Sequence, residues 1–239
     1  MSSSTRKRGK EGSDDRLFGT PAMQKKLKEA AGDMCYLLSR GYGERSSLQL
    51  VGNRYKLNVR QQKALLGMSA GSQQITSRRA RLVSADALKD QSLSIDGFNL
   101  LIILESALSG AYVFKGLDDC YRDISGVHGT YKRIQKTEEA LLLIGNNLNS
   151  LGVKQVHWIL DKPVSNSGRL KSMMNELAEE YAFPWEISLE NNPDTYLAES
   201  ASVVVSSDAW ILDRATRWFN LGAYLIEDCI EDANVIFSK

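Results

Sequence analysis

The stretch LSIDGFNLLIILESAL (93–108) joins a short apolar strand to a long apolar helix through one Asp-Gly step. The strand ends at Asp96, Gly97 allows a tight turn, and a helical pattern runs from Leu100 to Leu108. A buried strand that passes directly into a helix is typical of a β-α unit in a parallel sheet. This stretch therefore predicts an α/β fold.

The same alternation continues to the end of the chain. We expect helices over about 131–150, 170–181, 194–199 and 208–219, and strands over 155–160, 185–189, 202–207 and 223–226. Because the strands are rich in Val and Ile, they indicate a mainly parallel sheet covered by helices on both faces. Residues 91–239 are thus predicted to form one three-layer α/β domain.

The first 90 residues have a different character. Residues 1–20 are polar, with Arg6, Lys7, Arg8 and Lys10 clustered, and predict a disordered tail that either contacts phosphates or only aids solubility. Apolar residues at helical spacing then predict helices over 21–40 and 59–68. Together with the basic segment GSQQITSRRAR (71–81), these helices form a predicted helical module over residues 21–90.

Composition excludes several classes of protein. The chain has 30 basic and 29 acidic residues, so its net charge of +1 creates no overall field that attracts nucleic acid, and any basic surface is local. Three widely spaced cysteines argue against a disulfide framework and a cysteine-based zinc site, and favour a cytoplasmic location. No apolar run approaches the ~20 residues of a membrane helix, so no membrane partner is expected.

Acidic residues recur where the predicted strands end. Asp96 closes LSID, Asp161 closes QVHWILD (155–161), Asp208 follows SVVVSS (202–207), and Asp194 precedes that last strand. The carboxyl ends of parallel strands lie along one edge of a sheet, so these carboxylates are expected to converge and to bind Mg²⁺ or Mn²⁺. For each aspartate alone, a helix cap is the competing interpretation, most clearly for Asp194 and Asp208.

Polar neighbours extend this pattern. Asn99 is expected to point back at the site, where its amide can orient a phosphate or a water without adding charge. Ser206 and Ser207 are placed to hydrogen-bond the neighbouring carboxylates or a water. Candidate phosphate contacts are Arg169 and Lys171, which follow Asn166-Ser167-Gly168 past Asp161, and Arg214 and Arg217, on the helix expected after Asp208.

The segment DGFNLL (96–101), Asp161, DTYL (194–197) and the Ser207-Asp208 pair together resemble the PIN-domain-like superfamily, particularly its NYN branch, over about residues 92–228. The resemblance implies a metal-dependent ribonuclease with RNA as its partner. It makes Asp96, Asp161, Asp194 and Asp208 the metal-binding catalytic acids and Asn99 their polar companion, with Asp213 as a further candidate ligand. The whole chain, including YLLSRGY (36–42), also resembles a prokaryotic family named domain of unknown function 434, which implies no activity.

Other residues leave alternatives open. The stretch 112–131, with Asp118, Asp119, Asp123 and His128, is not explained by the resemblance and is either a substrate loop or packing. The four tryptophans, Trp158, Trp185, Trp210 and Trp218, and also His157 are expected in the core. One competing function is a binding module without catalysis that uses Arg78, Arg79 and Arg81; the other is a metal-dependent phosphatase or nucleotide hydrolase. Self-association remains open.

Overall fold

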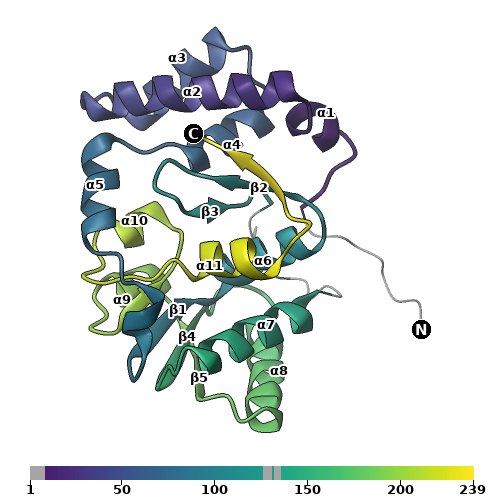
Figure 1. Ribbon diagram of the computed structural model, residues 1–239, viewed down its shortest axis with the longest axis vertical. Helices are drawn as coiled ribbons and strands as arrows, with labels where there is room; N and C mark the ends of the chain where they lie inside the picture. The colour runs from purple at the N-terminus through teal and green to yellow at the C-terminus, as the bar shows by residue number, and fades with distance from the viewer. Residues whose placement is uncertain (1–8, 126–130, 132–135) are drawn as a thin grey trace.

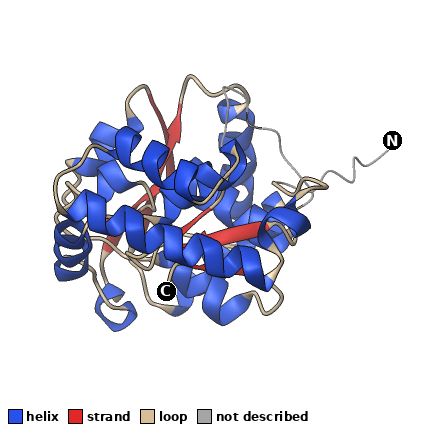
Figure 2. Ribbon diagram, turned by 90° about the horizontal axis from the view of Figure 1, so that it is seen from above, coloured by secondary structure: helices blue, strands red, loops and turns tan. Residues whose placement is uncertain are grey.

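A parallel four-stranded sheet is the centre of the molecule. The computed structural model describes residues 9–125, 131 and 136–239, and its larger sheet has the order β5-β4-β1-β6 with every neighbouring pair parallel (Figure 1). The strands are β1 (Ser92–Asp96), β4 (Gln155–Asp161), β5 (Trp185–Glu190) and β6 (Val203–Val205). Figure 2 shows helices on both sides of the strands, and the predicted parallel α/β architecture is confirmed.

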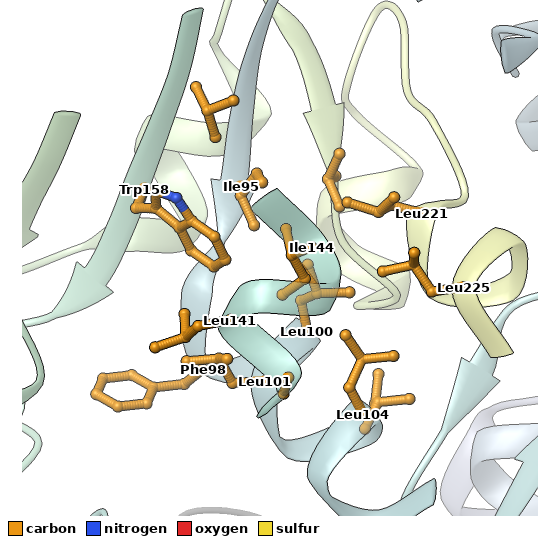
Figure 3. Packing of buried hydrophobic residues seen from close by; sticks show 14 of the residues in the cluster. Ile95, Phe98, Leu100, Leu101, Leu104, Leu141, Ile144, Trp158, Leu221 and Leu225 are labelled. Atoms are coloured by element: carbon orange, nitrogen blue, oxygen red, sulfur yellow. The ribbon is translucent and has the colours of Figure 1, made fainter. Parts of the chain in front are cut away.

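The two faces of this sheet are covered by different helices, because alternate residues of a strand point to opposite sides. Ile95 and Trp158 face one layer, where they pack with side chains of α6, α7 and α11 (Figure 3). Ile159 and Val204 face the other layer, formed by α9 and α10. The helices are α6 (Gly97–Leu108), α7 (Thr137–Ser150), α8 (Ser167–Glu180), α9 (Pro193–Ala198), α10 (Ala209–Leu212) and α11 (Leu221–Cys229).

A second sheet, absent from the sequence prediction, has the order β3-β2-β7. Its strands are β2 (Tyr112–Lys115), β3 (Tyr121–Arg122) and β7 (Asn234–Phe237). Phe114 of β2 and Ile236 of β7 are buried in the same cluster as side chains of the N-terminal helices. The stretch 112–131 therefore contains the strands on which the helical region packs, which answers part of the question left open for it.

The N-terminal region is helical, as expected, but richer in helices than its apolar pattern indicates. It contains α1 (Asp14–Phe18), α2 (Pro21–Ser39), α3 (Glu44–Arg54), α4 (Val59–Met68), α5 (Ser72–Ala80) and the 3-10 helix η1 (Ala85–Leu88). The helices α2 and α4 were predicted from periodicity. The expected tail is wrong over its described end, because Phe18 of α1 is fully buried against Phe114 at a ring distance of 5.0 Å.

Two expectations for the C-terminal part need correction. Residues 223–226 form part of helix α11 and not a strand, because Asn220 caps the helix through Ala223 and because Leu221 and Leu225 are buried one turn apart. The helix expected over 208–219 is only α10, after which the chain continues without helix to Trp218.

Some predicted features lie outside the described residues. These are the basic residues Arg6, Lys7 and Arg8, and His128. Within the parts of the chain that the structure describes, no helix has the length and apolar character needed to cross a membrane.

Candidate active site at the strand ends

The direction in which the strands are added reverses between β1 and β6. The chain moves outward from β1 to β4 and β5, then returns across the sheet to place β6 on the other side of β1. In open α/β sheets, ligands bind at such a reversal, beyond the carboxyl ends of the two strands that flank it. Asp96 is the last residue of β1, and Ser206, Ser207 and Asp208 follow β6 directly.

Hydrogen bonds join the two strand ends. Ser206 Oγ donates to Asp96 Oδ2 at 2.7 Å and accepts from the Asp208 backbone N–H at 3.0 Å. Asn99 Oδ1 accepts from both the backbone N–H and the hydroxyl of Ser207, each at 2.9 Å. The expected serine contact with a carboxylate is thus present for Ser206, whereas Ser207 binds the amide of Asn99. These contacts fix Asp96 and Asn99 in one arrangement.

Gly97 permits the close approach of α6 to β4. A Cβ atom at this position would lie 2.5 Å from Leu160 Cδ2 and 3.1 Å from the backbone oxygen of Ile159. The sequence predicted a tight turn as the reason for this glycine, but its φ is not among the positive values. Close packing is the physical reason, and it sets the start of α6 directly beneath the strand ends.

Burial and repulsion by neighbouring carboxylates raise the pKa values of Asp96 and Asp194. Burial raises the pKa of Asp96 to about 7, the hydrogen bond from Ser206 acts in the opposite direction, and the charges of Asp208 and Asp194 add to the increase. The pKa of Asp194 is raised by burial and then by Asp208 and Asp161, and the pKa of Asp161 is raised by burial. Asp96, Asp161, Asp194 and Asp208 therefore form one electrostatically connected group.

This acidic group lacks close basic partners. No Lys or Arg of the described residues lies in an ion pair with any of its four carboxylates. Arg122 of β3 also reaches the end of β6. Burial lowers the pKa of its guanidinium, but the charge of Asp118 and, to a smaller extent, that of Asp208 raise it above its usual value. However, its guanidinium donates to Asp118, to the backbone oxygen of Ser207 at 2.8 Å and to that of Gly67 at 2.8 Å. Sequence patterns gave no sign of this positioning role, because β3 itself was not predicted.

Asp208 has the capping role, one of the two interpretations that the sequence left open. Its Oδ1 accepts from the backbone N–H groups of Trp210 and Ile211, at 2.8 and 3.1 Å, and so caps α10. Its Oδ2 forms no hydrogen bond within the described part of the chain. One oxygen therefore caps the helix, and the other has no hydrogen-bond partner among the described residues.

A pocket of about 360 Å³ lies beside this group. It is lined by Asp161, Asn191, Asn192, Pro193, Asp194, Thr195 and Trp210. Trp210 is 43% exposed, so the expectation that it lies in the core is wrong, whereas Trp158 and Trp218 are fully buried as predicted. His157 is only partly buried, and both of its ring nitrogens are hydrogen-bonded, to Ser188 and to Tyr196.

The oxygen donors match the preference of hard divalent cations, since all four charged groups are carboxylates. The described residues nevertheless contain no group of three or more His, Cys, Asp and Glu side chains positioned to hold a metal ion. A cation shared by these carboxylates therefore requires their side chains to rotate towards one another. Because the carboxylates repel one another, that movement is favourable only with the cation bound.

Asp213 and Arg78 belong to a different, buried cluster. Arg78 is 2% exposed and donates to Asp213 Oδ1 at 2.7 Å and to Asp118 Oδ2 at 2.5 Å. Gln74 donates to the other oxygen of Asp213 at 3.1 Å. The structure therefore separates Asp213 from the four aspartates and places Arg78 in a structural ion pair, not on a substrate-binding surface.

The remaining basic candidates are dispersed. Arg217 hydrogen-bonds Gln91, which precedes β1, so it lies at the opposite end of the sheet from Asp96. Arg79 pairs with Asp119 at 2.9 Å. Arg169 lines another pocket of about 300 Å³, next to Asn166. Lys171 lies on the same helix, α8, while Arg214 contacts Trp210 at the acidic pocket.

Comparison with known proteins divides the chain into two matched segments. Residues 85–224 match the model of a family described as Domain of unknown function (DUF5616), and residues 26–81 match one described as Protein of unknown function (DUF434). The resemblance to the second family, expected over the whole chain, is thus limited to the helical region.

One curated relative, named Uncharacterized protein MJ0935, comes from Methanocaldococcus jannaschii. It is 30% identical to this chain over 186 residues, which cover 78% of this chain and 88% of the relative. No solved structure matches the chain.

Proposed function

The chain belongs to the family described as Domain of unknown function (DUF5616), and from its own residues we propose that it is a metal-dependent nuclease acting on RNA. The observation that carries this proposal is the group of four mutually repelling aspartates at the reversal of the parallel sheet. A carboxylate group with no ion-paired base among the described residues is suited to a divalent cation, with Mg²⁺ and Mn²⁺ as the matching ions. The likeness to PIN-like domains of the NYN type is part of the same proposal.

In this proposal, the residues that would hold the cation are Asp96, at the end of β1, Asp208, after β6, and Asp161 and Asp194, which line the pocket. When bound, a divalent cation neutralises the scissile phosphate and lowers the pKa of a water so that hydroxide is available near neutral pH. Asp96 must be ionised to take part, and its raised pKa makes this step depend on pH around 7.

The uncharged residues position this carboxylate. Ser206 donates to Asp96 and so favours its ionised form, which partly offsets the effect of burial. Asn99 holds the Ser207 backbone, and through it the start of the segment that carries Asp208. Both residues act on the reacting groups through their neighbours and are therefore positioning residues.

The test is degradation of labelled single-stranded RNA with Mn²⁺, for the wild type and for Asp96→Asn and Asp208→Asn. Asn at position 208 retains an oxygen that can cap α10, so folding should be preserved, as circular dichroism would check. We expect cleavage to require Mn²⁺ and to fall at least ~100-fold in both variants, because each removes a charge that holds the cation. Asp90→Asn is a matched control, since Asp90 is exposed and precedes β1 at its amino end.

The alternatives give different results. Turnover of mononucleotides with intact RNA would support a phosphatase or nucleotide hydrolase at the same site. RNA binding without any turnover would support a binding module. Equal cleavage by the wild type and both aspartate variants would show that a contaminating nuclease was measured, and the proposal would then be rejected.

A further inference from the structure

Trp210 occupies an unusual place for a large aromatic side chain. It lies two residues after Asp208 on α10, where Ile211 and Leu212 are fully buried and Trp210 is 43% exposed. Its side chain lines the acidic pocket together with Asp161 and Asp194. Its backbone N–H is held by Asp208, so the helix start that presents the indole is fixed to the proposed site.

Arg214 holds the indole from one side. Its guanidinium carbon lies 4.0 Å from the centroid of the Trp210 ring, and its Nη1 donates to the Trp210 backbone oxygen at 3.0 Å. The contact combines a cation–π interaction with a hydrogen bond one helical turn away, which restricts the orientation of both side chains. It also brings a positive charge next to Trp210, whereas the charged residues that line the pocket, Asp161 and Asp194, are acidic.

Aromatic rings and guanidinium planes are the surfaces on which proteins stack unpaired nucleic-acid bases. We infer that Trp210 and Arg214 form a stacking platform for one unpaired base, which makes single-stranded nucleic acid the substrate class of this site. This inference rests on the proposed function. A duplex does not meet the requirement, because its bases already stack on one another and their faces are covered.

The geometry assigns separate tasks to the two parts of the site. The aspartates repel phosphates and accept a nucleic-acid backbone only with a cation, whereas stacking on Trp210 requires no cation. A strand that places its base on Trp210 brings its adjacent phosphate towards Asp161 and Asp194, which line the same pocket. The volume of about 360 Å³ is at the lower end of the range for small-molecule pockets and suits one nucleotide.

The experiment measures binding and cleavage separately on the full chain. The probes are a fluorescein-labelled 12-nucleotide oligoadenylate RNA, the same backbone without bases, and a duplex of equal length. Anisotropy gives the dissociation constants in Mg²⁺ at low temperature, and gel analysis of the same samples gives cleavage. The variants are Trp210→Ala, Trp210→Phe and the control Tyr181→Ala, which removes an aromatic ring that is 42% exposed before β5.

Trp210→Ala should bind the oligoadenylate about 10-fold more weakly than the wild type, since one stacked base contributes a factor of roughly 5 to 150. Trp210→Phe should recover most of the loss, and Tyr181→Ala should bind as the wild type does. Neither the abasic strand nor the duplex should respond to the change at position 210.

The outcomes distinguish the inference from the proposed function. If the proteins cleave RNA and Trp210→Ala binds the oligoadenylate as tightly as the wild type does, the platform would be overturned and the proposed nuclease activity would stand. If only Trp210→Ala loses affinity, and only for the strand that has bases, the platform would be supported. If none of the proteins cleaves RNA in the same samples, the result would count against the nuclease. An equal loss for the abasic strand would overturn the platform, because stacking would not be its cause.

Discussion

Replacing Asp96 by Asn tests the electrostatic strain at the strand ends. Burial, together with Asp208 and Asp194, raises the pKa of Asp96 from 3.8 to about 7. Because the pKa in the folded state lies above that of the unfolded chain, the stability linked to this group is complete below 3.8 and is lost as the pH rises through 7. One pKa unit corresponds to ~1.36 kcal/mol, so the ionised carboxylate destabilises the fold by roughly 4 kcal/mol at most.

The expected gain in the Asn variant follows from this value. Asp96 is partly exposed, and solvent screening reduces the effect to about 2 kcal/mol, while Asn can still accept the hydrogen bond from Ser206. Urea unfolding in EDTA, followed by circular dichroism at several pH values, measures the difference. The variant should be more stable than the wild type at pH 8 and similar to it at pH 4. Asp90→Asn, which removes an exposed charge at the other end of β1, should show no such dependence.

Divalent cations provide the second half of this experiment. In the wild type, Mn²⁺ should restore stability at pH 8, because it neutralises the ionised group, and it should restore less in Asp96→Asn. A gain in the variant that is independent of pH, or a loss of stability at pH 8, would refute the reasoning. Either result would mean that the carboxylate of Asp96 is not held in an unfavourable charged state.

Gly97→Ala should destabilise the protein by ~2 kcal/mol in urea unfolding, because the added Cβ would lie 2.5 Å from Leu160 Cδ2. Gly168→Ala is the control and should be neutral or slightly stabilising, because a Cβ at that position would have no other atom within 4 Å. Arg78→Met should lower the free energy of unfolding by ~3–5 kcal/mol, because it leaves buried carboxylates without their base; a loss below about 1 kcal/mol would contradict this role. Burial raises the pKa of Asp118, but the guanidinium groups of Arg122 and Arg78 outweigh it and lower the pKa to about 2. The stability that ionised Asp118 contributes is therefore present above pH 3.8 and lost as the pH falls towards 2. Acid unfolding of the wild type and of Asp118→Asn measures this loss.

Strongly periodic segments could be predicted from the sequence, and weakly apolar ones could not. The central sheet and helices such as α2 and α4 follow from apolar spacing and from caps such as Asn58. Helix α5 has only one large apolar residue, Ile75, and depends on contacts of Arg78 with residues more than a hundred positions away in sequence. Such long-range ion pairs leave no local periodic signal.

For the candidate site, the sequence indicated which strand ends meet but not how the side chains there are oriented. The ends of β1 and β6 were expected to come together, and they do, through Ser206 and Asn99. Apolar residue type alone suggested that Trp210 is buried, because a four-residue helix has too few positions for a periodic pattern to show which side faces solvent. Side-chain direction in short helices is therefore beyond this kind of reasoning.

The buried cluster around Arg78 has a consequence for how this protein can be divided. Arg78 lies in the segment that matches one family, while Asp118 and Asp213 lie in the segment that matches the other. Expressing either segment alone would expose or leave unpaired the charged groups that the other segment neutralises. The seam between the two family descriptions, near residue 82, thus marks a boundary of classification and not a place where the polypeptide can be cut.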